Sequence, residues 1–155
     1  MAISGTYSDG DAINMADCEV EVDLTPASSS YANIDSWASE IAVGNEEVNS
    51  TETYTFTHTG PIIFTGNPSP IEVTVTCVYT EGTTDPYYNI KNQALGALTD
   101  VRWGPAGAGS GGNAFSTSGG RLIRRGLPQG AADGSTATVF PFMVRCSSVS
   151  LGTIT

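Results

Sequence analysis

Apolar and polar residues alternate along much of this chain, and the alternation is most regular between Ile71 and Tyr79. Every second residue of that segment is apolar, and glutamate, threonine and valine stand between them. Side chains of a β-strand point to opposite faces with a period of two. The segment Ile71–Thr80 therefore predicts a strand with one buried face, and this is the strongest strand signal in the chain.

A second alternating segment, Cys18–Leu24, places Glu19, Glu21 and Asp23 opposite four apolar residues. It predicts a half-buried strand with an acidic outer face. Residues 51–59 alternate threonines with Glu52, two aromatic residues and a histidine, so they also predict a strand, because β-branched and aromatic residues favour extended structure.

Further segments indicate strands separated by Gly, Pro, Asn and Asp clusters, and Gly66–Pro70 is expected to be a turn. The additional strands are expected at 98–103, 113–118, 120–125, 136–146 and 148–155. The spacing of Ile34, Trp37 and Ile41 fits either a helix or an irregular packed segment, and the sequence does not decide between the two.

One helix is predicted over residues 86–95. Asp85 is expected to supply the N-cap oxygen, Pro86 suits the first helical position, and Gly96 marks the end. Tyr87, Ile90 and Ala94 would form the stripe that packs on a sheet.

Together these elements predict a mainly β fold, an antiparallel β-sandwich or half-barrel with one flanking α-helix. The 155 residues are the size of one domain, so residues 1–155 are expected to form a single β domain with extended termini. A hydrophobic fraction of 39% against only 14% charged residues excludes an intrinsically disordered chain.

Charge is distributed unevenly along the chain, whose net charge is −10. Residues 1–100 hold fifteen of the 16 acids and a single base, Lys91, whereas residues 101–155 hold Asp133 and five arginines. Opposite charges on one molecule suit a head-to-tail contact between copies. We therefore expect a subunit interface that joins the basic cluster to acids of the first part, with these candidate residues: Arg121, Arg124, Arg125, Glu46, Glu47 and Glu52.

Motifs for catalysis or ligand binding find little support. The segment Gly107–Gly112 matches G-x-G-x-x-G, but a strand-like segment follows it instead of a helix, so a loop is expected. Asp9-Gly-Asp11 lacks the remaining ligands of a calcium loop. Since no metal, cofactor or catalytic residue is indicated, we expect a protein that is not an enzyme.

The reactive side chains are few. The three cysteines, at positions 18, 77 and 146, have no paired short spacing and are expected to be buried thiols. The single histidine, His58, is expected to be partly exposed or at an interface. The chain contains no apolar run of membrane-spanning length, and its start does not resemble a signal peptide, so a cytoplasmic location without membrane contact is expected.

The order of several segments resembles the tail tube (major tail) proteins of long-tailed bacteriophages. The resemblance rests on Ile71–Gly82, the helix at Asp85-Pro86, Val101–Gly107, Phe115–Gly119, and the Asp133-Gly134 turn before Val139–Val144. It implies a β-sandwich or half-barrel subunit that assembles into hexameric rings, whose inner strands join into a continuous barrel. The rings would stack into the tube through which DNA leaves the capsid.

The resemblance also implies partners and a location. Copies of the chain itself, tape measure, tail terminator and tail tip proteins would be the partners, and DNA would pass without specific binding. The protein would be made and assembled in the host bacterial cytoplasm and would reside in the virion tail. Related tubes have an acidic lumen, and Glu19, Glu21 and Glu72 are lumen-facing candidates, although an ordinary solvated face accounts for them equally well. The termini and Glu46–Glu52 are expected to become ordered on assembly.

Two other functions are compatible with the same sequence. A capsid decoration protein or an adhesin-like β-sandwich would stay a monomer or small oligomer and bind through loop tips such as Gly104–Gly112. A hydrolase that uses a carboxylate pair would need a concave pocket with perturbed acids.

Overall fold

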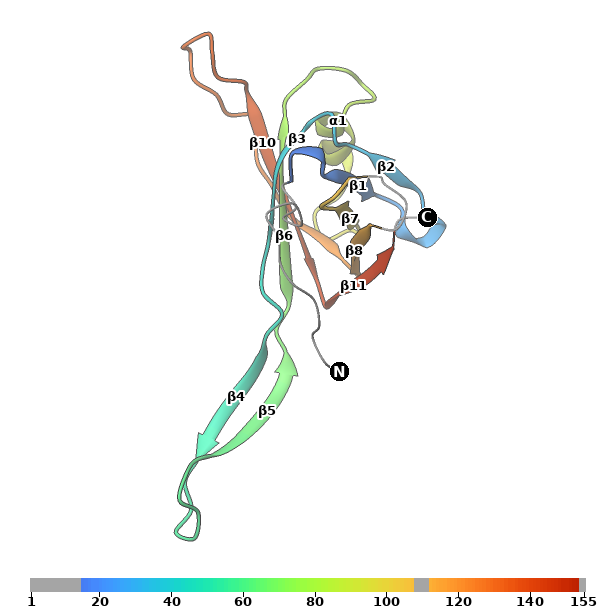
Figure 1. The fold of residues 1–155 in the computed structure, drawn as a ribbon. Helices are drawn as coiled ribbons and strands as arrows, with labels where there is room; N and C mark the ends of the chain where they lie inside the picture. Colours follow the sequence, from blue (N-terminus) through green and yellow to red (C-terminus); the bar gives the residue numbers. More distant parts are fainter. Residues whose placement is uncertain (1–14, 108–111, 154–155) are drawn as a thin grey trace.

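The computed structural model describes residues 15–107 and 112–153, which are mainly antiparallel β-strands with one α-helix (Figure 1). The motif at Asp9–Asp11 lies outside these residues. Two short 3-10 turns, Met15–Asp17 and Pro26–Ser28, flank the first strand. The elements are β1 (Glu19–Asp23), β2 (Tyr31–Asn33), β3 (Ala38–Val43), β4 (Val48–Thr53), β5 (Ile62–Pro68), β6 (Ile71–Val78), α1 (Pro86–Asn92), β7 (Asp100–Gly104), β8 (Asn113–Ser118), β9 (Arg121–Arg125), β10 (Val139–Cys146) and β11 (Ser148–Thr153).

Two sheets form the body of the molecule and do not close into a barrel. A five-stranded sheet has the order β11-β8-β7-β1-β2, and a four-stranded sheet has the order β3-β6-β10-β9. Every pairing within them is antiparallel. The fold class predicted from the sequence, a mainly β antiparallel arrangement with one helix, is confirmed.

The core lies between the two sheets. β6 alternates buried and half-buried residues over its whole length, as its period-two pattern predicts, and Val73, Val75 and Cys77 are fully buried. They share one apolar cluster with Val20 of β1 and Phe140 of β10. Because the inward faces of both sheets contribute to one cluster, the outward faces of the two sheets lie on opposite sides of the body.

A long hairpin, β4–β5, projects away from the body (Figure 1). β4 continues from β3 and β5 leads into β6, so the hairpin extends the β3–β6 pair beyond the sandwich. Its residues are almost all exposed, and in the described part of the chain its two strands pair only with each other. We call residues 48–68 the arm and residues 54–61 the arm tip.

The arm corrects two predictions. Residues 51–59 are not one strand, because β4 ends at Thr53 and the chain reverses through 54–61 before β5. The turn expected at Gly66–Pro70 begins later than predicted, because β5 continues to Pro68. Local β-propensity does not specify where a chain reverses, since that depends on the pairing register of Thr53 with Ile62.

The helix is shorter than predicted and begins differently. α1 covers Pro86–Asn92 and not 86–95, because Gln93 is already extended. Pro86 occupies the first turn as expected. Asp85 does not cap the helix with its side chain, since its carboxylate accepts a hydrogen bond from the amide of Gly82 at 2.9 Å.

Three further expectations change in detail. The segment that contains Ile34 and Trp37 is a strand–turn–strand, with β2 before Ile34 and β3 after Trp37, so it is neither a helix nor irregular throughout. Asp23 does not belong to an exposed acidic face, since it is only 1% exposed and accepts a hydrogen bond from the amide of Thr25 at 2.8 Å. The strand expected at 136–146 begins at Val139.

Candidate assembly surfaces

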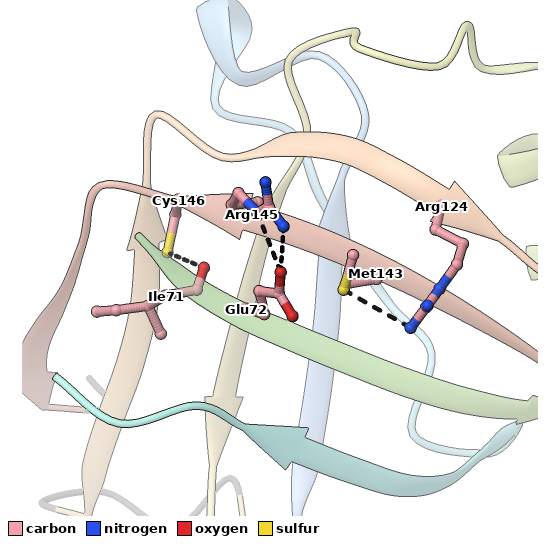
Figure 2. Close-up of polar contacts among 6 residues, drawn as sticks. All are labelled: Ile71, Glu72, Arg124, Met143, Arg145 and Cys146. Atoms are coloured by element: carbon pink, nitrogen blue, oxygen red, sulfur yellow. Dashed lines mark hydrogen bonds and ion pairs between the residues drawn. The ribbon is translucent and has the colours of Figure 1, made fainter. Parts of the chain in front are cut away.

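The outward face of the four-stranded sheet carries a row of charged residues across three adjacent strands. Glu72 of β6 lies opposite Arg145 of β10, which lies opposite Arg121 of β9. The Arg145 Nε donates to Glu72 Oε1 at 3.1 Å, and its terminal nitrogen donates to the same oxygen (Figure 2). Both side chains are nearly half exposed, so water screens the pair and its contribution to stability is small.

Arg124 lies on the same face, one row further along β9. It is opposite Met143 of β10, and its terminal nitrogen is 3.8 Å from the Met143 sulfur (Figure 2). Within the residues that the structure describes, no carboxylate lies within ion-pair distance of Arg124. A thioether is a weak acceptor, so the charge of Arg124 has no strong partner among the described residues.

The other two arginines of the predicted interface cluster are bonded within the chain. Arg121 donates to the carbonyl of Gly96 at 2.8 Å. Arg125 points to the opposite side of the sheet and donates to the carbonyls of Ile90 and Gln93 at the end of α1. The structure therefore separates the three arginines, and of the three only Arg124 makes no strong bond to another described residue.

Acidic residues lie at the opposite border of the same sheet, on β3, and in and before the arm. Glu40 of β3 is exposed and lies opposite Thr76, which places it on the same outward face as Glu72. The predicted interface residues Glu46 and Glu47 lie between β3 and β4, and Glu52 lies in β4, all of them exposed. The arginines at β9 and the acids at β3 thus occupy opposite borders of one sheet.

The outer edges of β3 and β9 differ in how many of their main-chain groups are already hydrogen-bonded within the subunit. β3 is the terminal strand at one border, and within the described chain no strand pairs with its outer edge. At the other border, the amide of Gly96 donates to Leu122 and the amide of Leu122 donates to Ala97, so the segment 96–98 covers the first half of β9. Arg124 lies beyond this covered part.

The five-stranded sheet presents a different outward face. Glu21 of β1 forms an ion pair with Arg102 of β7, and the Arg102 guanidinium lies 4.4 Å from the ring centre of Tyr31. The hydrogen bond from Arg102 to Glu21 raises the pKa of Arg102. A groove of about 420 Å³ runs beside them, and small residues such as Ala114, Ser116 and Gly152 contribute to its lining.

The three lumen-facing candidates do not share a surface. Glu19 and Glu21 lie on the five-stranded sheet, whereas Glu72 lies on the outward face of the four-stranded sheet. These faces are on opposite sides of the body, so one channel wall cannot include all three. The four-stranded face carries two glutamates and three arginines in the described chain, and it is therefore mixed in charge and not acidic.

The reactive groups form no site in the described residues. Burial raises the pKa of the Cys77 thiol to about 12, which suppresses the nucleophilic thiolate, and Cys146 is also buried, whereas Cys18 is half-buried. His58 lies on the exposed arm tip, where its Nδ1 is 2.9 Å from the Thr55 hydroxyl oxygen. No group of three or more metal-ligating side chains is brought together, and no helix is long and apolar enough to cross a membrane, in the part of the chain that is described.

Sequence reasoning missed several residues of these surfaces. Arg145 and Arg102 each pair with a glutamate more than seventy positions earlier, and only the strand register brings these partners together. Glu40 carried no signal because it lies in the segment whose structure the sequence left open. The exposed aromatic residues of the arm tip are visible in the sequence, but their alternation indicated a paired strand.

Comparisons with known proteins identify similar folds. No family model matches the chain, and no curated protein matches it. A chain in the structure of the anti-feeding prophage cap, described as a tube terminating cap, is similar with a TM-score of 0.69 and 13% identity, covering 99% of this chain and 96% of that one. A chain in the sheath-tube complex of the extracellular contractile injection system PVC, in its extended state, has a TM-score of 0.70 and 12% identity, covering 96% and 100%.

A third similar structure comes from a phage-like particle. A chain in the tail of the empty gene transfer agent particle has a TM-score of 0.61 and 11% identity over 93% of this chain and all of that one. Each alignment extends over nearly the whole length of both chains, so the likeness concerns the complete fold and not a local motif. The chain therefore has the fold of tail and tube components of phage-like particles, as its resemblance to tail tube proteins led us to expect.

Proposed function

We propose that this protein is a structural subunit of a phage-like tail that assembles with copies of itself into stacked rings and so forms a tube. The whole-length similarity to chains of tube-containing injection systems and of a gene transfer agent tail supports this role. The observation that carries the proposal is the opposite charge on the two borders of the four-stranded sheet.

Rings form when the β9 border of one copy meets the β3 border of the next. Along the sheet, β3, β6, β10 and β9 alternate in direction, so β9 runs opposite to β3. Pairing β9 with the β3 of a neighbour therefore continues the antiparallel alternation. Such a head-to-tail contact uses two different surfaces and closes into a ring when the rotation between copies permits.

Charge selects this pairing over others. Arg124 and Glu40 lie on the same face at opposite borders, so edge-to-edge pairing brings the free guanidinium of one copy next to the carboxylate of another. Arg121 would lie nearer the neighbour's Glu46, whereas Arg125 donates a hydrogen bond to α1 of its own chain. Arg124–Glu40 is thus the central pair of the proposed interface, with Arg121 and the acids Glu46, Glu47 and Glu52 around it.

In such a ring the four-stranded sheet lines the channel. Glu72 then faces the channel as part of the Glu72–Arg145 pair, and Glu19 and Glu21 face outward. A wall of mixed charge rich in threonine gives a polyanion no continuous row of free cations, so DNA passes without tight binding. Six copies per ring, and the tape measure, tail terminator and tail tip proteins as partners, follow from the resemblance to tail tube proteins.

Electron microscopy of the purified protein tests the proposal. Rings or hollow tubes are expected for the unmodified protein. Arg124→Glu and Glu40→Arg should each abolish rings, and the double variant should restore them because the pair is then reversed. Lys91→Glu, an equal change of charge on the exposed face of α1, is the matched control and should still assemble.

A capsid decoration protein or adhesin-like module is the alternative function. It would remain a monomer or small oligomer at high concentration, and Arg124→Glu would leave that state unchanged. A monomer that persists in concentrated solution would therefore overturn the tube proposal.

A further inference from the structure

The arm tip exposes aromatic side chains that contact no core. Phe56 is fully exposed and Tyr54 is 73% exposed, on a hairpin that projects from the body (Figure 1). From Tyr54 to Phe64 the chain contains no aspartate, glutamate, lysine or arginine. Large apolar groups gathered at the end of an arm indicate a contact with another surface.

An apolar groove of about 360 Å³ lies at the side of α1. It lies between the helix and the β1–β2 connection, and Ile34, Trp37, Pro86 and Ile90 contribute to its lining. Every described residue that lines it is uncharged. We call it the α1 groove, and its volume lies in the range of pockets that enclose a bound group.

The arm tip and the α1 groove lie at opposite ends of the molecule. The arm extends away from the body on the side opposite to α1 and β2 (Figure 1). A contact between complementary surfaces at opposite ends displaces each added copy in one direction, and it repeats as an open stack when the rotation between copies does not close a ring. Within one subunit the arm cannot reach its own groove.

We propose that the arm tip of one copy, with Phe56 as its anchor, seats in the α1 groove of a copy in the adjacent ring. This inference rests on the proposed assembly into stacked rings and names the contact that stacks them. Aromatic residues that enter a desolvated pocket at the centre of a contact supply most of the binding energy at interfaces.

Charge favours this pairing of surfaces. Each copy has a net charge of −10, so copies repel one another wherever their acids approach. The acids nearest the arm tip are Glu46 and Glu47, which lie just before the arm, and Glu52 in β4, and the tip itself contains no acidic residue. Contact through two surfaces without acidic residues in the described chain keeps the stacking junction clear of this repulsion.

A second apolar groove is a less suitable receiver. Val43, Ile71, Trp103, Phe115 and Leu151 contribute to its lining, and Val43, the last residue of β3, lies a short loop before the arm. It therefore lies at the base of the arm, at the same end of the molecule. An arm that points away from this end would not meet the same groove of a copy stacked in the same orientation.

The first test uses single variants whose folding is checked by their thermal melting temperature. Phe56→Ser should leave rings intact and abolish their stacking into tubes, as seen by electron microscopy. Leu151→Ser removes another exposed apolar side chain, from the second groove, and should still form tubes. Tubes formed by Phe56→Ser, or their loss in Leu151→Ser alone, would overturn the inference.

The second test asks whether the two surfaces belong to one junction. Ala32→Trp adds a large side chain at an exposed position of the α1 groove and should also yield single rings. When preformed Phe56→Ser rings are mixed with preformed Ala32→Trp rings, the intact arm of one kind meets the intact groove of the other. The mixture should form pairs of rings and nothing longer.

The outcomes separate this inference from the proposed function. Absence of rings in the unmodified protein would defeat the assembly proposal itself. Rings that form and stack while the Phe56→Ser and Ala32→Trp mixture yields only single rings would defeat the arm–groove contact alone.

Discussion

The guanidinium of Arg125 donates a hydrogen bond to the main-chain carbonyl of Ile90 across 3.1 Å and thereby joins β9 to the last turn of α1. The same group also donates to the carbonyl of Gln93. Carbonyls at the end of a helix lack amide partners and carry partial negative charge, so a cation there stabilises the helix. Arg125 is therefore a helix cap in this subunit, and its neighbour Arg124 is the residue available to a second copy.

Replacing Arg125 by alanine should lower the free energy of unfolding by about 1–3 kcal/mol, because charged hydrogen bonds to two partly buried carbonyls are lost. Arg125→Lys should recover part of the loss, since it keeps the charge but not the fork of donors. Urea denaturation of the subunit measures both. Arg124→Ala is the control and should change stability by less than about 0.5 kcal/mol; a loss equal to that of Arg125→Ala would contradict the assigned roles.

Gly120, between β8 and β9, is packed too closely for a side chain. A Cβ there would lie 2.7 Å from both the Asp100 carboxylate and the Val144 side chain, and closer still to the Thr99 carbonyl. Gly120→Ala should therefore destabilise the subunit by about 1–3 kcal/mol or more, as overpacking does. Gly60→Ala, where a Cβ meets nothing within 4 Å, should be nearly neutral. Calorimetric melting compares the two, and equal melting temperatures would refute the packing argument.

Burial of the Cys77 thiol should make the free energy of unfolding depend on pH. Its pKa is raised by burial from 9.0 to about 12, so above pH 9 the unfolded chain loses this proton while the folded chain keeps it. The contribution to folding is complete below pH 9 and is lost as pH rises toward 12. Between these pH values, this one group should lower the free energy of unfolding with a slope that approaches about 1.4 kcal/mol per pH unit.

Cys77→Ala supplies the comparison for that prediction. The variant is less stable at neutral pH because the substitution leaves a cavity. Since alanine has no thiol to titrate, the free energy of unfolding of the variant should decline less steeply between pH 9 and 11. Urea midpoints at several pH values give both slopes. Parallel slopes for the two proteins would show that Cys77 does not titrate differently in the folded state.

Strand identity was predictable from the sequence wherever one face is buried over the full length. β6 follows its alternation residue by residue because its inward side chains are all core residues. The start of α1 was also predictable, since Pro86 is suited to the first turn. The end of α1 was not, because Arg125, a residue distant in sequence, bonds the carbonyls at that end.

The sequence shows that three arginines cluster at β9, but it does not show which of them faces outward. Strict alternation would place Arg121 and Arg125 on one face and Arg124 on the other. The pairing of β9 with β10 shifts between Met143 and Val144, so Arg121 and Arg124 share the outward face and Arg125 lies with Phe142. A bulge leaves no trace in an alternation pattern, and it changes which arginine a neighbour can meet.

Salt should distinguish the two proposed contacts between copies. Between about 0.01 M and about 1 M salt the Debye length falls from about 30 Å to about 3 Å, which screens exposed charges. Salt also weakens the general repulsion between copies of net charge −10, so comparisons between variants are more informative than absolute association. Arg124→Gln should form rings less readily than the unmodified protein at low salt, and this difference should shrink as salt rises.

The defect of Phe56→Ser should follow the opposite course. Its lost contact is apolar on both sides, and burial of apolar surface is not screened by salt. The failure of its rings to stack should therefore persist at 1 M sodium chloride, whereas the Arg124→Gln defect should nearly disappear. Sedimentation velocity resolves subunits, rings and stacks in the same experiment. Stacking by Phe56→Ser that recovers with salt would show that charge, and not the aromatic tip, controls the junction between rings.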